Sequence, residues 1–193
     1  MMKLGILGST NGTDLQAIIE AEKTNKLKAT INVVISNMEN AYILQRAKNN
    51  GVPAIFINHK NKKRDDFDFE ISMELEKHNI DLILLIGFMR ILSAKFCQTW
   101  KDKILNVHPS LLPKYSGGMD MNIHEEVIAN GDEESGCTIH FVTEELDGGP
   151  ILIQKKYNIT NGETAETLKT KIQELEGIAF VEAINKLSKK NSI

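Results

Sequence analysis

The chain has 193 residues, of which 41% are hydrophobic and 25% charged, a composition typical of a globular domain with a sizeable core. Its formal net charge of −3 gives no support for nucleic-acid binding, which usually requires a basic face. No apolar stretch approaches the length of a membrane span, and the apolar start at Met1–Gly8 is too short for a signal peptide. Cys97 and Cys137 have neither metal-ligand spacing nor a disulfide framework, so we expect buried thiols and a cytoplasmic location.

Short β-like runs alternate with helical patterns over the first two thirds of the chain. The predicted strands of this part are Lys3–Leu7, Ile31–Ser36, Pro53–Ile57, Asp81–Ile86 and Lys103–Val107. The spacing of apolar residues predicts helices between Leu15 and Leu27, over Ala41–Asn50, and from Phe67 to about Asn79. This alternation is typical of a doubly wound α/β fold, with a mostly parallel sheet covered by helices on both faces.

The last third of the chain has a different pattern. Two β-runs, Cys137–Thr143 and Ile151–Asn158, are joined by a glycine-rich link and suggest an antiparallel addition to the sheet. A long helix follows, with apolar residues from Leu168 to Leu187 facing inward. Because no repeat, linker or low-complexity tract interrupts the chain, we expect residues 1–193 to form a single domain. Ligands of open parallel sheets bind beyond the carboxyl ends of the strands, so functional residues are expected there.

The segment Gly8–Asp14 follows the first strand and opens a helix. Backbone N–H groups at a helix start, beside small residues, suit a phosphate group, although the segment has neither a Walker nor a dinucleotide-binding pattern. The alternative is an ordinary turn capped by Thr13 or Asp14, and these residues alone favour neither interpretation. Asp14 complicates phosphate binding, because its carboxylate could accept the helix-start N–H groups and repels an anion.

Two further strand ends carry unusual residues. In Gly87–Leu92, the segment alone favours a surface ion pair for Arg90, and the alternative is a pocket wall for a flat heteroaromatic ligand. Asn106 and His108 point to the same side of their strand, because side chains alternate along a strand. Such a pair could hold an oxyanion and handle a proton. A lone Asn-x-His is more often structural, but its place at a strand end favours the chemical interpretation.

The link between the last two strands contains Asp147-Gly148, which is a common hairpin signal. The turn is therefore the preferred interpretation, and Asp147 gains a functional role only if the fold brings it to His108. His140 lies between apolar residues and is expected to be a hydrogen-bonded core residue. The remaining histidines are expected at the surface or in loops: His59, His78 and His124. No cluster of His, Cys and carboxylate residues resembles a zinc site.

Together these segments resemble the phosphoribosylglycinamide formyltransferase family, in the same order and over nearly the whole chain. The sharpest matches are Gly87–Leu92, Asn106–Pro113, and His140–Thr143 running on to Leu146–Pro150. The second and third of these are specific for folate-dependent formyltransferases as a group. The start at Leu15-Gln16-Ala17-Ile18 and the length of the chain point to the glycinamide ribonucleotide branch.

The resemblance implies a Rossmann-like formyltransferase fold and transfer of a formyl group from 10-formyltetrahydrofolate to glycinamide ribonucleotide in purine biosynthesis. The folate is implied as a consumed cosubstrate, and no metal is implied. The implied catalytic residues are Asn106, His108 and Asp147. The residues implied to bind the ribonucleotide are Gly12, Thr13, Asp14, Gln173 and Glu176. Those implied to bind the folate are Arg64, Met89, Arg90, Ile91, Leu92, Asn106, Thr143, Glu144, Glu145, Leu146 and Asp147.

Under this hypothesis, Asn106 and a protonated His108 donate hydrogen bonds to the oxyanion. Asp147 then holds His108 in its charged form and relays a proton, through water, from the attacking amine to the departing folate nitrogen. The resemblance also implies a cis peptide bond at Leu112-Pro113. The chain departs from the family in having Asp14 where Asn is usual. Its segment 116–124 also exceeds that of many members by about three residues, and no ligand contacts are assigned within it.

Several other functions remain open from the sequence. One is formyl transfer to another acceptor, such as initiator methionyl-tRNA or an amino sugar, or hydrolysis of formyltetrahydrofolate; those relatives carry an additional domain that we do not expect here. A folate- or nucleotide-binding module would not require the catalytic trio, and a nicotinamide-dependent oxidoreductase would be expected to carry the dinucleotide pattern. We expect small-molecule substrates, no nucleic-acid or membrane partner, and either a monomer or a homodimer.

Overall fold

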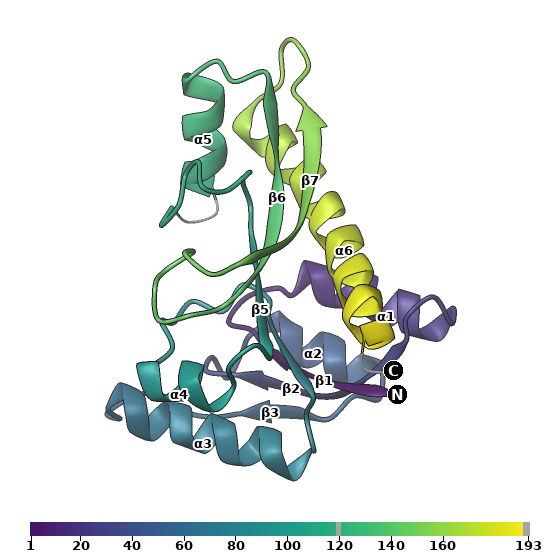
Figure 1. Cartoon of the computed structure of the whole chain (residues 1–193), viewed down its shortest axis with the longest axis vertical. Coiled ribbons are helices and arrows are strands. Elements are labelled where there is room, and N and C mark those ends of the chain that lie inside the picture. The colour runs from purple at the N-terminus through teal and green to yellow at the C-terminus, as the bar shows by residue number, and fades with distance from the viewer. Residues whose placement is uncertain (119–120, 191–193) are drawn as a thin grey trace.

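A computed structural model describes residues 1–118 and 121–190 of the chain, which form seven strands and six helices (Figure 1). The strands are β1 (Met2–Leu7), β2 (Ala29–Ser36), β3 (Ala54–Phe56), β4 (Leu82–Leu85), β5 (Ile104–His108), β6 (Glu134–Phe141) and β7 (Ile151–Asn158). The helices are α1 (Thr13–Lys23), α2 (Tyr42–Asn49), α3 (Arg64–Lys77), α4 (Ala94–Thr99), α5 (Met121–Ala129) and α6 (Ala165–Lys190).

The seven strands form one sheet in the order β3-β2-β1-β4-β5-β6-β7. The first five strands pair in parallel, whereas β6 is antiparallel to both β5 and β7. The strand order reverses direction between β1 and β4, which makes that junction the topological switch point of a doubly wound sheet. The expected α/β fold, with antiparallel strands toward the C-terminal end, is confirmed.

Alternating side chains of the central strands supply two separate hydrophobic cores. Leu82 and Leu84 of β4 pack in the core on the side of α1, α2 and α6, whereas Ile83 and Leu85 pack in the core on the side of α3 and α4. This alternation follows from the two-residue period of a strand, and burial on both faces explains why β4 is apolar throughout. Helices on both faces therefore fix the ends of the central strands.

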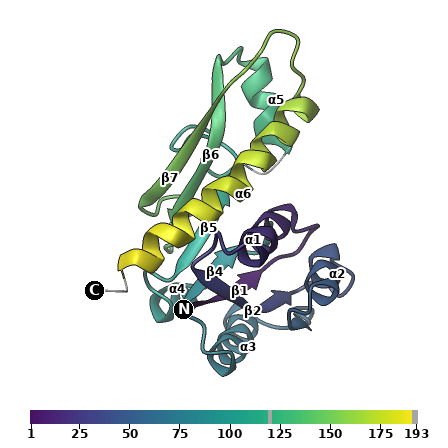
Figure 2. The ribbon, with the colours of Figure 1, turned by 90° about the vertical axis from the view of Figure 1, so that its right-hand side faces the viewer.

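The antiparallel part extends away from the parallel part of the sheet. Figures 1 and 2 show the long strands β6 and β7 projecting beyond β5, with α5 and α6 beside them. Helix α6 packs on β6 and β7, and also on α5 and α1. It therefore joins the two parts of the molecule. No helix within residues 1–118 and 121–190 is long and apolar enough to cross a membrane.

Most elements lie where the sequence predicts them, with ends that differ by at most four residues; β7 has the predicted bounds. Two helices, α4 and α5, were not predicted. Helix α4 has only six residues, which is too short to display a helical period. Its start is set locally instead, because the Ser93 hydroxyl accepts a hydrogen bond from the Phe96 N–H, and the Asp68 carboxylate accepts one from the Ser93 N–H.

Candidate active site

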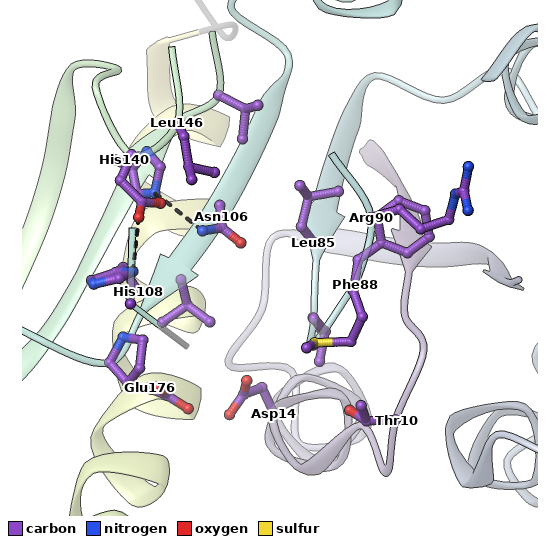
Figure 3. Close-up of a pocket in the computed structure, with 18 of the residues that line it drawn as sticks. Thr10, Asp14, Leu85, Phe88, Arg90, Asn106, His108, His140, Leu146 and Glu176 are labelled. Atoms are coloured by element: carbon purple, nitrogen blue, oxygen red, sulfur yellow. Dashed lines mark hydrogen bonds and ion pairs between the residues drawn. The ribbon is translucent and has the colours of Figure 1, made fainter. Parts of the chain in front are cut away.

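A cavity of about 580 Å³ opens at the carboxyl ends of β1, β4 and β5, at the switch point of the sheet (Figure 3). Its volume falls in the range of about 300–1,000 Å³ that is usual for small-molecule sites. The lining comes from loops after these strands, from the link before β7, and from helices α5 and α6. It consists mainly of Thr10–Asp14, Leu85–Leu92, Asn106–Pro109, Gly117, Gly118, His124, His140, Val142–Asp147, Lys169, Gln173 and Glu176.

The end of β5 places Asn106 and His108 side by side in this cavity. Both side chains line it, as the two-residue period of the strand predicts. His108 is almost completely buried, with 3% of its surface exposed. Beyond the strand the chain turns through Pro109 and the Leu112-Pro113 peptide bond, which is cis as the resemblance implies. The predicted pairing of an amide donor with an imidazole is therefore present at the strand end.

The link between β6 and β7 brings Asp147 to His108. One carboxylate oxygen, Oδ2, lies 3.3 Å from Nδ1 of His108 and accepts a hydrogen bond of 2.8 Å from the Gly117 N–H. The link is also a turn, as the sequence predicts: Asp147 has a φ of 54°, and the Gly148 N–H bonds to the Glu145 carbonyl. A side chain at Gly149 would overlap the Phe141 carbonyl oxygen, so glycine is needed for the link to fold back on β6. The turn thus serves to aim a buried carboxylate.

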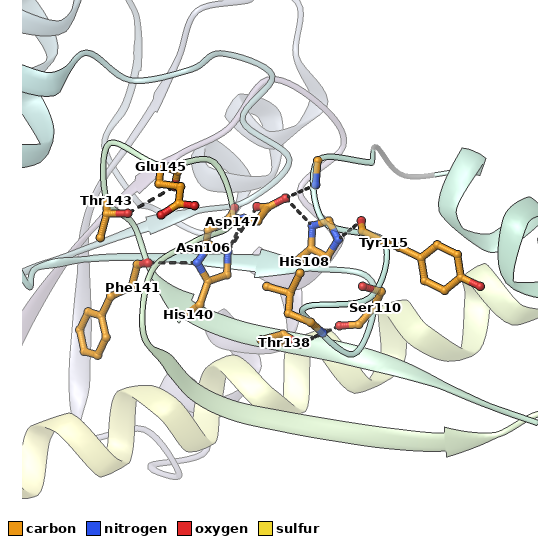
Figure 4. A network of polar contacts seen from close by, with 12 residues as sticks. Asn106, His108, Ser110, Tyr115, Thr138, His140, Phe141, Thr143, Glu145 and Asp147 are labelled. Carbon is orange, nitrogen blue, oxygen red and sulfur yellow. Dashed lines mark hydrogen bonds and ion pairs between the residues drawn. The ribbon is translucent and has the colours of Figure 1, made fainter. Parts of the chain in front are cut away.

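Both ring nitrogens of His108 face acceptor atoms (Figure 4). Nε2 lies 2.9 Å from the carbonyl oxygen of Tyr115, and Nδ1 faces Asp147. Only the doubly protonated, positively charged ring donates to both acceptors. The Nδ1–Oδ2 distance of 3.3 Å to Asp147 is longer than a usual N–H···O bond, so the Nδ1–H of a charged ring could be shared with an additional acceptor in the cavity.

His140 lies opposite Asn106 across the β5–β6 pair and holds its amide. The Nε2 atom of His140 is 3.1 Å from Nδ2 of Asn106, and Nδ1 is 3.0 Å from the carbonyl oxygen of Phe141. Burial lowers the pKa of His140, although the Phe141 carbonyl and the nearby Asp147 carboxylate act in the opposite direction. The neutral ring therefore donates from Nδ1 to the carbonyl and accepts from Asn106 at Nε2. One amide N–H of Asn106 is used in this bond, and the second remains for a ligand.

The turn before α1 has the features expected of an anion site. Gly12 adopts a left-handed conformation with a φ of 65°, and a side chain there would overlap Ile43. Helix α1 begins at Thr13, and no side chain caps its first N–H groups. The alternative of a turn capped by Thr13 or Asp14 is not observed, because the N-cap residue is Gly12 and no side-chain cap bonds to the helix start. Uncapped N–H groups at a helix start attract anions.

Asp14 lies in the first turn of α1 and points into the cavity (Figure 3). Only 6% of its surface is exposed, and its Oδ1 atom has no hydrogen-bond partner. Burial raises the pKa of Asp14 to about 7, because it disfavours the charged carboxylate. The expected competition between this side chain and a phosphate for the helix-start N–H groups is thus not observed.

The segment after β4 forms the opposite wall of the cavity. Met89 and Ile91 expose about half of their surfaces, and Leu92 is buried. The guanidinium of Arg90 stacks over the ring of Phe67, with 4.7 Å between its central carbon and the ring centre. The surface ion pair favoured from this segment alone is not found among the described residues; the guanidinium packs on an aromatic face instead, although its charge still acts to lower the pKa of the Asp68 carboxyl. The alternative, a wall of the pocket, agrees with the lining.

The structure gathers almost all of the predicted site residues around one cavity. From the predicted ribonucleotide set it brings together Gly12, Thr13, Asp14, Gln173 and Glu176. From the predicted folate set it brings together Met89–Leu92, Asn106 and Thr143–Asp147. Arg64 is the exception, because it is an exposed residue at the start of α3 outside the lining. Within residues 1–118 and 121–190, no three His, Cys, Asp or Glu side chains are grouped to hold a metal ion.

Two histidines of the cavity were placed elsewhere by the sequence analysis. His124 was expected at the surface or in a loop, and this expectation is wrong: it lies in α5, is 1% exposed and lines the cavity. His140 is buried and hydrogen-bonded as expected, but its contacts with Asn106 and Asp147 were not foreseen. Helical spacing of Ile123 and Val127 was the available signal for α5. Within the segment 116–124, Met119 and Asp120 lie outside the described residues.

Comparison with known proteins agrees with this geometry. The family model described as formyl transferase matches residues 2–184. Phosphoribosylglycinamide formyltransferase of Escherichia coli is 42% identical over 176 residues, covering 91% of this chain and 82% of the relative. The human trifunctional purine biosynthetic protein adenosine-3 is 40% identical over 183 residues, which cover 94% of this chain but only 18% of that protein.

Solved structures give the same grouping. Glycinamide ribonucleotide transformylase 1 of Symbiobacterium toebii superposes with a TM-score of 0.93 and 34% sequence identity, over 98% of this chain and 89% of that chain. The match thus extends over the parallel sheet, the antiparallel addition and the cavity between them. The chain belongs to the formyl transferase family and, within it, to the group of phosphoribosylglycinamide formyltransferases.

Proposed function

We propose that this protein transfers the formyl group of 10-formyltetrahydrofolate to the amine of 5′-phosphoribosylglycinamide, a step of purine biosynthesis. The observation that carries the proposal is the cluster of Asn106, His108 and Asp147, set at one cavity together with an uncapped helix start. The relatives' names give the formyl group and its acceptor, the family implies a folate-derived donor, and the cavity offers a place for both substrates.

The two substrates would meet at the end of β5. In Figure 3, Asn106 and His108 lie between Leu146 on one side and Asp14 with Glu176 on the other. We assign the folate ring to the wall formed by Met89–Leu92 and the link before β7. The phosphate of the ribonucleotide would lie at the N-terminus of α1, where the helix dipole favours negative charge. Its amine would then reach toward Asn106 and His108.

The reaction begins with attack of the neutral amine on the formyl carbon, which places negative charge on the formyl oxygen. The free N–H of Asn106 and the Nδ1–H of His108 would donate to this oxygen. Fixed donors of this kind are each worth about 3–4 kcal/mol in a transition state. Because His140 and Tyr115 already hold Asn106 and His108 in place, little reorganisation is needed when the charge forms.

The tetrahedral species then collapses with cleavage of the bond between the formyl carbon and the folate nitrogen. The attacking nitrogen loses one proton and the departing folate nitrogen gains one, so the charges balance. Asp147 lies beside His108 and would relay this proton through a water molecule. Its carboxylate would also stabilise the positive charge on His108 throughout the reaction.

The test is an absorbance assay that follows formyl loss from 10-formyltetrahydrofolate with and without the ribonucleotide. We expect formyl loss only when the ribonucleotide is present, with formylated ribonucleotide as the product. Formyl loss at the same rate without the ribonucleotide would instead identify a hydrolase. Formyl loss that requires a different amine would overturn the proposed acceptor.

A further inference from the structure

The end of the cavity formed by α1 and α6 contains two buried carboxyl groups that face one another. Figure 3 shows Asp14 of α1 and Glu176 of α6 pointing into the cavity from its two sides. Asp14 is 6% exposed and Glu176 is 8% exposed. Two carboxylates in a buried site repel each other, and burial alone disfavours the charged form of each.

Other ionisable groups lie in or near the cavity with Asp14. Lys169 and Glu176 of α6, His124 of α5 and His108 of β5 line it, and the thiol of Cys137 of β6 lies within electrostatic reach of Asp14. The negative charges of Glu176 and Asp14 both raise the pKa of the Cys137 thiol, which places the two carboxyl groups within electrostatic reach of one point on β6. The guanidinium of Arg46 on α2 donates to the Asn11 carbonyl and to the Gln16 side chain.

The backbone beside Asp14 attracts anions, while an ionised Asp14 would repel them. The first turn of α1 has no side-chain cap, and the Oδ1 atom of Asp14 has no partner. A phosphate dianion at this helix start would add further negative charge next to a buried carboxyl group. A carboxylic acid at the same position is neutral and offers an O–H donor instead of repulsion. Burial favours that form already, since it raises the pKa of Asp14 to about 7.

We propose that Asp14 is a proton-linked binding residue: it holds a proton in the substrate complex and donates its O–H to an anionic oxygen of the phosphorylated substrate. Binding of the dianion at pH 8 therefore takes up one proton from solution, onto the Asp14 carboxylate. The inference rests on the proposed function only for the identity of the ligand, the ribonucleotide. Glu176 lies across the cavity from Asp14.

The sign of the pH dependence follows from this linkage. Below pH 7 most Asp14 side chains already carry the proton, so binding is nearly independent of pH. Above pH 7 the competent fraction falls about tenfold per pH unit, and the apparent affinity for the ribonucleotide falls with it. Asp14→Asn supplies a neutral donor of the same shape at every pH, so its affinity should stay level from pH 7 to pH 9 apart from ligand ionisation.

The experiment is titration calorimetry of the ribonucleotide into the wild type and Asp14→Asn, at pH 6 and pH 8, each in two buffers of different ionisation enthalpy. Ionisation of the ligand's amine and phosphate is common to both proteins and cancels in the difference. We expect the wild type to take up about one proton more than the variant at pH 8, and about 0.1 proton more at pH 6. Glu176→Gln tests the other carboxyl group: whatever the affinity of this variant for the ribonucleotide, binding should still take up the proton.

Three results would overturn the inference. Equal proton uptake by the wild type and Asp14→Asn, with both binding the ribonucleotide, would show that Asp14 is not the group that takes up the proton. Loss of the uptake in Glu176→Gln but not in Asp14→Asn would assign the proton to the other carboxyl group. Absence of ribonucleotide binding in every protein at both pH values would contradict the proposed function, and this inference would fall with it.

Discussion

The two ends of the cavity differ in how their polar groups are satisfied. At the end formed by β5, β6 and the link before β7, the functional side chains already have protein partners: His140 holds Asn106, and Tyr115 with Asp147 holds His108. At the end formed by α1, the helix start has no side-chain cap and one oxygen of Asp14 has no partner. Under the proposed function, the first end is preorganised for chemistry, and the second would be completed by a ligand.

This difference indicates that the two ends of the cavity have different roles. Donors that must stabilise a transition state work best when they are fixed before the charge develops. A binding subsite can leave its donors open, because the ligand satisfies them on arrival. Substitutions at the β5 end should therefore lower turnover, whereas substitutions at the α1 end should change affinity, stability and their dependence on pH.

The largest effect is expected for Asp147→Asn. The amide keeps the size of the side chain but removes the charge that faces His108 and the proposed proton relay. We expect kcat to fall by about 100- to 10,000-fold, the usual contribution of acid–base catalysis, with an unchanged fold. Steady-state kinetics measure the loss, and circular dichroism with thermal melting checks the fold. Near-normal turnover of a folded variant would show that Asp147 has no part in the chemistry.

The next effect is expected for Asn106→Ala, which removes one proposed donor to the oxyanion. A loss of about 100- to 1,000-fold in kcat is usual for one such donor. The KM for the ribonucleotide should change little, because we propose that its phosphate binds at the other end of the cavity. Measurement of kcat and KM separately tests this split. A rise in KM with unchanged kcat would instead make Asn106 a residue of ground-state binding.

A smaller effect is expected for His140→Phe, which removes the acceptor that orients the Asn106 amide. We expect a loss of roughly 5- to 10-fold in kcat, the value of about one hydrogen bond. In the Asn106→Ala background the same substitution should have almost no further effect, since the group it orients is absent. A full additive loss in the double variant would show that His140 acts independently of Asn106.

The smallest effect, on stability, is expected for Asp14→Asn. The folded-state pKa of Asp14, about 7, lies above its ordinary value of 3.8, so between these pH values the folded protein binds more protons than the unfolded chain. Wild-type stability therefore falls as pH rises through this window, and the variant should lose that dependence. At pH 8 the variant should melt higher, by about 2–4 °C for each kcal/mol gained. A lower melting temperature for the variant at pH 8 would contradict the claim that burial destabilises the ionised Asp14 carboxylate.

The sequence predicts the sheet well because the residue pattern of a strand shows whether one or both of its faces are buried. Apolar and β-branched runs such as Leu82–Leu85 must be covered on both faces, which specifies a doubly wound fold. The common direction of Asn106 and His108 could also be predicted from the sequence, because residues two apart on a strand point to the same side. The prediction of a catalytic role for Asp147 depended on the family resemblance, since Asp-Gly between two strands is by itself only a turn signal.

The remaining features depend on contacts between distant parts of the chain. The pairing of His140 with Asn106 is set by the register of β5 against β6, which no local pattern encodes. The environment of Asp14 is set by the left-handed backbone of Gly12 and by α6, which begins about 150 residues later in the chain. His124 was misplaced because α5 follows a glycine-containing segment and has only nine residues in which to display a period.

The most direct test of the division between the two ends is titration calorimetry of the ribonucleotide against Asp147→Asn, beside its turnover. The variant should bind the ribonucleotide within about threefold of the wild-type affinity, while its turnover falls by at least about 100-fold. That result would separate a preorganised reacting end from a ligand-completed binding end. A parallel loss of affinity and turnover would contradict the account, because it would show that Asp147 supports substrate binding as much as the chemistry.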